Sequence, residues 1–255
     1  MSRTYEALMK AERSRARDVG TNGANGNGHA NGVGQRGRVG VDRHDPAHLE
    51  YEKIRVWLRH PSTNGDRLQT VMIVSCHSGT GSTTTAALLG TTLAEGKHSR
   101  VLIIDSNFRT PGMNLLFQVQ NDSGLSDITT DGLPFEAEIQ ATDRKNLFVL
   151  SAGMNASPLD VFDGEAIEQL INELRSRFDY ILFDAAPTVD FPDAYALAAK
   201  VDGIILVAEP EHTLIEEAQR TKRDLERAGG RILGVVLNRH KDFLPASVRR
   251  SVGAW

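Results

Sequence analysis

The sequence predicts an α/β fold: a doubly wound, mainly parallel sheet with helices on both faces. Short apolar runs recur along the chain and are continuous rather than alternating, as expected of strands that helices cover on both sides. Stretches with helical periodicity separate these runs, and the links between them are short. Strand and helix therefore alternate, which is the order that builds a parallel sheet by crossover connections.

The individual elements follow from these patterns in chain order. The stretch HLEYEKIRVWLRH, 48–60, predicts a helix closed by Pro61. The predicted strands are 70–75, 101–105, 147–150, 180–184, 203–207 and 232–237. Helices are predicted over 83–94 and over 213–228. Between them, a third helix is predicted from an amphipathic stretch that places Ile167, Leu170, Ile171 and Leu174 on one face. The last helix is expected to bury Leu214, Ile215, Ala218 and Leu225, and to end at Gly229 and Gly230.

Composition divides the chain into four regions. Residues 1–19 predict a short helix with Tyr5, Leu8 and Met9 on one side, which is either a docking peptide or a frayed, solvated end. Residues 20–45 are rich in Gly and Asn and have almost nothing to bury, so we expect a flexible linker. Residues 46–240 form the globular domain, and 241–255 form a C-terminal tail.

Charge and cysteine content exclude several classes of protein. The formal net charge of −4 argues against a nucleic-acid-binding surface, so no nucleic-acid partner is expected. The single cysteine, Cys76, fits a reducing compartment. The N-terminus has no apolar segment typical of a secretory signal, and no apolar run approaches the roughly 20 residues of a membrane helix. We therefore expect a cytoplasmic protein.

A glycine-rich turn joins the first predicted strand to its helix in VSCHSGTGSTTTAALLG, 74–90. Gly79 and Gly81 permit a tight turn of inward N–H groups, and the helix N-terminus adds its positive end. Thr83 stands where a hydroxyl would reach Mg²⁺ in a P-loop. The pattern G-x-x-x-x-G-K-[ST] is matched only at its end, because Cys76 replaces the first glycine and Ser82 the lysine.

Two aspartates strengthen the prediction of a phosphate site. Asp105 and Asp184 each end a strand of apolar residues, VLIID and YILFD. In a parallel sheet both would open on the same edge as the glycine turn, where ligands of such folds bind. One such aspartate is common as a helix cap, whereas two beside a glycine-rich turn favour a phosphate and metal site.

From about residue 50 to 239 the chain resembles the bacterial tyrosine kinases of capsule and exopolysaccharide systems, a branch of the deviant P-loop ATPases that also includes chromosome-partitioning ATPases. The resemblance rests on SGTGSTTTAALLGTTLA, VLIIDSNFRTPGMNLLF, the segment around YILFDAAPTVDFPD, and GVVLNR. The opening MSRTYEALMKAE also resembles the N-terminus of kinases tied to polysaccharide loci.

The resemblance implies a site for ATP or ADP with Mg²⁺. It assigns the phosphates to Gly79, Thr80, Gly81, Ser82, Thr83 and Thr84, and the adenine edge to Asn238. It assigns Mg²⁺ to Thr83 and Asp184, and catalysis to Asp105, Asp184 and Arg109.

Three departures from the family pattern predict a degenerate kinase. Ser82 replaces the phosphate-loop lysine, Asn107 replaces a second carboxylate, and the C-terminal tail lacks the family's tyrosine cluster. The family's subunit-contact motif survives only as Glu52 and Arg55. We expect weak nucleotide binding and weak or absent phosphoryl transfer.

The resulting expectation is a regulatory or adaptor subunit in exopolysaccharide or capsule chain-length control and export. Its implied partner is a membrane polysaccharide co-polymerase or a related active kinase, which would place it at the inner membrane through that partner. Whether the chain forms a homo-oligomer is left open. One alternative is an active ATP-dependent tyrosine kinase in which Arg109, or an arginine of a neighbouring subunit, replaces the lysine. Another is a partitioning-type ATPase switch, disfavoured because His77 stands at that group's signature lysine.

Overall fold

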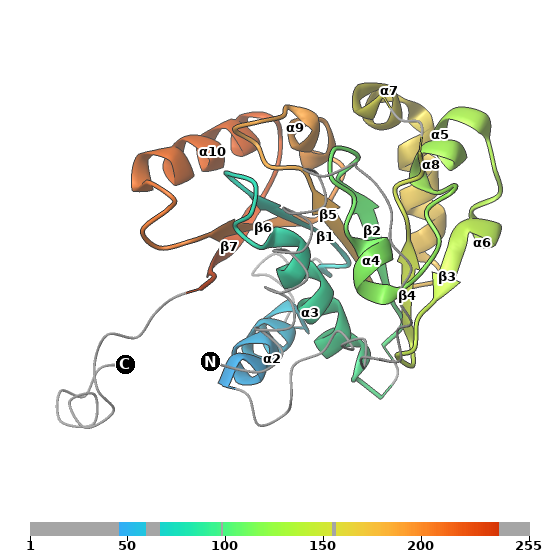
Figure 1. The fold of residues 1–255 in the computed structure, drawn as a ribbon, viewed down its shortest axis with the longest axis horizontal. Coiled ribbons are helices and arrows are strands. Elements are labelled where there is room, and N and C mark those ends of the chain that lie inside the picture. Colours follow the sequence, from blue (N-terminus) through green and yellow to red (C-terminus); the bar gives the residue numbers. More distant parts are fainter. Residues whose placement is uncertain (1–45, 60–66, 98, 155–156, 240–255) are drawn as a thin grey trace, which may run out of the picture.

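The computed structural model describes residues 46–59, 67–97, 99–154 and 157–239 (Figure 1). The predicted N-terminal helix, the linker and the tail from 241 lie outside these ranges. The described strands are β1 (Thr70–Ser75), β2 (Val101–Ser106), β3 (Ile139–Ala141), β4 (Leu147–Leu150), β5 (Tyr180–Ala185), β6 (Gly203–Ala208) and β7 (Ile232–Leu237). The longer helices are α2 (Pro46–Arg59), α3 (Ser82–Ala94), α8 (Glu165–Arg175) and α10 (Ile215–Arg227). The shorter ones are α4 (Met113–Phe117), α5 (Leu125–Asp131), α6 (Phe135–Glu138), α7 (Pro158–Asp163) and α9 (Asp193–Ala198).

The seven strands form one sheet in the order β3-β4-β2-β5-β1-β6-β7. All neighbours are parallel except β3 and β4, so the predicted doubly wound, mainly parallel sheet is confirmed. The edge strand β3 was not predicted, because three residues, IQA, carry no readable apolar pattern. The short helices were missed for the same reason: four to seven residues are too few to establish a 3.6-residue period.

Helices cover both faces of the sheet, each over its own apolar cluster. On one face, alternate strand residues such as Met72 and Leu102 pack against α5, α7, α8, α9 and α10. On the other, residues such as Ile73 and Ile103 pack against α2, α3 and α4. Figure 1 shows α2 and α3 side by side under one face. The central strands β1, β2, β5 and β6 are fully buried, which explains why their sequences are continuously apolar. The edge strand β7 is partly exposed, at Val235 and Leu237 among others.

Helix α2 packs against α3 through Tyr51 and Leu58, which are 9% and 3% exposed. Its opposite side leaves Leu49, Val56 and Trp57 about half exposed. In the described part of the chain no helix has both the length and the apolarity needed to span a membrane.

The predicted apolar face of the last helix is partly wrong. Helix α10 buries Leu225 and Thr221, but Leu214 and Ile215 are 61% and 72% exposed. The first turn of the helix borders an open apolar cavity over β6 and β7, which Ile215 lines with Val235 and Leu237. Helical periodicity identified the side of the helix but not where its contact with the sheet begins.

Candidate nucleotide site at the phosphate loop

The glycine turn between β1 and α3 forms a preorganised loop. Gly79 and Gly81 adopt the left-handed backbone conformation, with φ of 78° and 92°, as the sequence predicted. The hydroxyls of Ser75 and Thr80 both donate to the His77 carbonyl, at 2.9 and 2.8 Å. These bonds fold the loop on itself just before the N-terminus of α3, where N–H groups without helical partners can bind an anion.

Ser82, in the position of the missing lysine, faces inward. It is 9% exposed, and its Oγ lies 3.5 Å from Ser75 Oγ. Thr83 and Thr84 follow on the first turn of α3 and are both partly buried. The phosphate loop therefore presents hydroxyls and amides, and its sequence from 76 to 84 contains neither lysine nor arginine.

Asp105 and Asp184 are brought side by side by the pairing of β2 with β5. They are Cα partners in the ladder, and both are fully buried. The Asp105 carboxylate accepts bonds from the Gly112 and Met113 amides, at 2.8 and 3.0 Å, and so holds the start of α4. The Asn107 amide also donates to Asp105, at 3.2 Å.

Asp184 is the unusual member of the pair. Its two carboxylate oxygens are buried, and no described residue donates a hydrogen bond of good geometry to them, although the Thr83 hydroxyl lies nearby. Burial raises the pKa of Asp184 well above its ordinary value; the neighbouring Asp105 raises it further, while the Thr83 hydroxyl acts in the opposite direction. A buried carboxylate without a partner is costly unless it is protonated or binds a cation. Asp184 next to Thr83 is thus an arrangement that fits Mg²⁺.

The side chains of Arg109 and Asn107 are both engaged by neighbouring groups of the protein. Arg109 donates from Nε to Asp193, at 3.2 Å, and its guanidinium lies 4.8 Å from the centre of the Phe191 ring. Asp193 is 1% exposed, so it anchors this arginine firmly. Asn107 donates its side-chain amide to Thr110, at 3.1 Å.

Asn238 follows β7 and reaches the phosphate loop directly. Its side-chain amide donates to the Thr80 carbonyl, at 2.8 Å. A Cβ atom at Gly81 would collide with this amide, so the approach requires glycine there. The structure thus brings Asn238 to the loop, while the contact with adenine stays a prediction.

A cavity of about 540 Å³ opens beside the loop, between the ends of β6, β7 and the start of α10. His77 Nε2 lies 3.0 Å from Glu217 on α10, and Arg239 donates to Glu209, at 2.8 Å, across the cavity. The hydrogen bond with His77 lowers the pKa of Glu217. Sequence reasoning assigned no function to Glu209, Glu217 or Arg239, because only the fold brings their elements to the loop.

The loop and the acidic pair lie at the carboxyl edge of a mainly parallel sheet, an arrangement typical of a P-loop NTPase. A family model of the ParA type, described as NUBPL iron-transfer P-loop NTPase, matches residues 67–251. The chain belongs to this family, and within it to the bacterial tyrosine-protein kinases, as the sequence resemblance indicated.

Three relatives illustrate this placement. The chain is 30% identical over 193 residues to the tyrosine-protein kinase YwqD of Bacillus subtilis, covering 75% of this chain and 81% of the relative. It is similar to the kinase domain of VpsO, with a TM-score of 0.69, 29% identity and coverage of 76% and 95%. It is also similar to the septum site-determining protein MinD of Pyrococcus horikoshii complexed with Mg-ADP, with a TM-score of 0.56, 25% identity and coverage of 72% and 76%.

Proposed function

We propose that this protein is a catalytically weak member of the bacterial tyrosine-protein kinases that binds Mg-nucleotide and acts as a regulatory or adaptor subunit. One observation carries the proposal: Ser82 stands buried in the lysine position of a loop that is otherwise shaped to hold phosphate. The family is a nucleotide-binding one, and the MinD relative was solved with Mg-ADP.

Nucleotide binding is supported by what the site retains. The glycine turn and the N-terminus of α3 supply amide donors for phosphate, and Thr83 with Asp184 would hold Mg²⁺. Mg²⁺ would offset the negative charge that ATP brings to the buried aspartates. We therefore expect binding to depend strongly on Mg²⁺.

Weak catalysis is supported by what the site lacks. A lysine contact to phosphate contributes on the order of 1.5–3 kcal/mol to binding. A cation that neutralises charge in the transition state is worth about 10³–10⁵ in rate, with the arginine finger as the comparison. Ser82 donates one neutral hydrogen bond. Arg109, the candidate replacement within this chain, is held by Asp193 and Phe191.

The iron-transfer part of the family description does not extend to this chain. Iron–sulfur clusters are held by several cysteine thiolates, whereas this sequence has one cysteine, Cys76, which is buried. The role in polysaccharide export, and the membrane co-polymerase or active kinase as partner, rest on the family resemblance.

The test is calorimetric titration of ATP and ADP with and without Mg²⁺, followed by assays for phosphate release and phosphotyrosine. We expect Mg²⁺-dependent binding and turnover at least about 10³-fold below that of the Ser82→Lys/Asn107→Asp double variant. Brisk turnover of the unaltered protein with a phosphotyrosine product would support the active kinase instead. Turnover that rises steeply with protein concentration would indicate an arginine supplied by a neighbouring subunit.

A further inference from the structure

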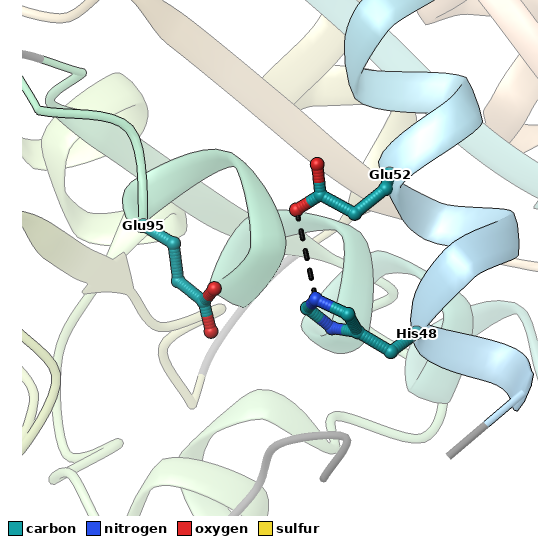
Figure 2. A group of neighbouring side chains, drawn as sticks. All are labelled: His48, Glu52 and Glu95. Carbon is teal, nitrogen blue, oxygen red and sulfur yellow. Dashed lines mark ion pairs between the residues drawn. The ribbon is translucent and has the colours of Figure 1, made fainter. Parts of the chain in front are cut away.

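A second group of ligating side chains lies where α2 meets the end of α3. His48 and Glu52 are one turn apart on α2, and Glu95 caps the C-terminus of α3 (Figure 2). One ligand atom from each residue lies within 4.8 Å of the other two. The phosphate loop is at the opposite end of α3, roughly 20 Å away by the length of the helix, so this group is separate from the nucleotide site.

The geometry of His48 and Glu52 differs from that of a hydrogen-bonded pair. His48 Nε2 is 3.8 Å from Glu52 Oε1, beyond the 2.7–3.2 Å range of an N–H···O bond. The two side chains are nevertheless held in place, at 15% and 23% exposure. Figure 2 shows the imidazole and the two carboxylates approaching one space from α2 and from the end of α3.

Arg55 orients Glu52 from the other side. Its guanidinium binds Glu52 Oε2, at 2.5 Å, and also donates to the Thr92 carbonyl of α3, at 3.4 Å. The arginine therefore engages one carboxylate oxygen and leaves Oε1 turned toward His48. Such an outer hydrogen bond is the usual means by which a protein fixes the direction of a metal-binding carboxylate.

The donor set indicates a particular class of ion. One imidazole nitrogen with two carboxylate oxygens suits Zn²⁺ and its neighbours Co²⁺ and Ni²⁺, whereas Mg²⁺ and Ca²⁺ prefer oxygen ligands alone. Ligands about 2.0–2.2 Å from a tetrahedral zinc lie about 3.4 Å apart. The present separations reach up to 4.8 Å, so binding requires the glutamate side chains to turn inward. The two carboxylates bring two negative charges, one of which Arg55 already offsets in part.

We propose that His48, Glu52 and Glu95 form a binding site for a zinc-class divalent cation that joins α2 to the C-terminal end of α3. Three protein ligands leave one position for water. Because the ligands come from two helices, binding requires the folded packing of α2 on α3. The ion therefore stabilises the folded chain by RT ln(1 + c/Kd), where c is the free zinc concentration, so stability keeps rising with that concentration.

The test uses the full chain without an affinity tag, stripped of metal and free of nucleotide. Calorimetric titration with ZnCl₂ is expected to show one site, and the melting temperature is expected to rise with zinc concentration. His48→Ala and Glu95→Gln should each weaken zinc binding at least about tenfold, since each removes one of three ligands. Millimolar Mg²⁺ should not displace the zinc.

Two matched controls separate this site from general metal binding. Glu50→Gln changes a carboxylate on the same helix that pairs with Lys53, and His212→Ala removes an exposed histidine elsewhere. Both should bind zinc as the unaltered protein does. Melting without metal confirms that each variant folds, and Glu95→Gln, at an exposed position, carries the test if His48→Ala does not fold. Absence of a zinc site, or unchanged affinity in Glu95→Gln, would overturn the proposal.

Discussion

At the residue scale, the phosphate site pairs two buried carboxylates with a loop that has no lysine. Asp105 is engaged by backbone amides, but no described residue donates a hydrogen bond of good geometry to Asp184. The site thus has unbalanced negative charge in its buried part and neutral donors in its loop. Two substitutions test these two features separately.

Restoring the cation should strengthen nucleotide binding. Ser82→Lys adds a charge-assisted contact to phosphate of on the order of 1.5–3 kcal/mol, which corresponds to roughly 10- to 150-fold in affinity for ATP. Calorimetric titration of ATP in the presence of Mg²⁺ measures this gain in affinity. Ser176→Lys, at the exposed C-terminal end of α8, adds the same charge outside the site and should leave the affinity for ATP unchanged. An unchanged affinity in Ser82→Lys would mean that the loop does not hold phosphate as a P-loop does.

Removing the charge of Asp184 should stabilise the metal-free protein. The pKa of Asp184 is raised in the folded state, so between the ordinary value near 3.9 and the raised value the folded chain binds more protons than the unfolded one. Stability is therefore lost as pH rises through that window and stays reduced above it. Asp184→Asn removes this loss, and we expect a melting temperature several degrees higher in EDTA at neutral pH.

The same variant should lose the gain in melting temperature that Mg-nucleotide confers, because the amide is a poorer Mg²⁺ ligand than the carboxylate. Thermal melting from pH 5 to 8, with and without Mg-ADP, measures both effects. Asp163→Asn, at an exposed position, is the control and should behave as the unaltered protein. A lower metal-free melting temperature in Asp184→Asn would show that the carboxylate is satisfied in the folded protein.

At the scale of single elements, the apolar residues of α10 differ in burial along the helix. Its apolar residues follow helical spacing, yet Leu225 is fully buried while Ile215 is largely exposed. The C-terminal half of the helix packs into the core, whereas the first turn borders an open cavity over β6 and β7.

Truncating Leu225 and truncating Ile215 should therefore have very different effects on the free energy of unfolding. Leu225→Ala leaves a cavity and should cost about 2–5 kcal/mol of the free energy of unfolding. Ile215→Ala should change it by less than about 0.5 kcal/mol. Urea denaturation of both variants measures the difference. Equal losses would mean that Ile215 is covered in solution, for instance by a bound partner chain.

At the scale of the whole molecule, the described tyrosines are poorly placed as phosphate acceptors. Tyr51 and Tyr180 are 9% and 7% exposed, and burial raises the pKa of the Tyr51 phenol. Tyr195 is partly buried, and burial raises the pKa of its phenol too. The last sixteen residues contain no tyrosine.

We therefore expect no phosphotyrosine on the protein itself after incubation with ATP and Mg²⁺. Mass spectrometry with synthetic phosphopeptide standards for each tyrosine checks this. Stoichiometric phosphorylation at Tyr5 would indicate an active kinase whose acceptor has moved to the N-terminal side. Phosphorylation at Tyr51 would require local opening of α2 from α3.

The region before α2 gives the last prediction at this scale. Residues 1–45 lie outside the described part of the chain, and the docking role of the segment with Tyr5, Leu8 and Met9 stays a prediction from the sequence. Deleting residues 1–40 should leave the melting temperature almost unchanged and weaken co-purification with the polysaccharide machinery. Unfolding on deletion would assign the segment a structural role, and unchanged partner binding would refute docking.

The sequence by itself determined the sheet and its ligand-binding edge. Six strands could be read because each is a short, continuous apolar run, and the glycine turn could be read because glycine adopts its positive φ angles without strain. The sequence also showed that Ser82 replaces the phosphate-loop lysine, because this substitution is visible at a single position of a local motif.

Only the tertiary structure decided which side chains meet. The contact of Asp105 with Asp184 requires β2 to pair with β5, the anchoring of Arg109 requires α9, and the approach of Asn238 to Thr80 requires β7 at its place in the sheet. The group of His48, Glu52 and Glu95 likewise exists only because α2 lies against α3. Local sequence patterns record the environment of each segment, whereas these contacts depend on the relative placement of segments far apart in the chain.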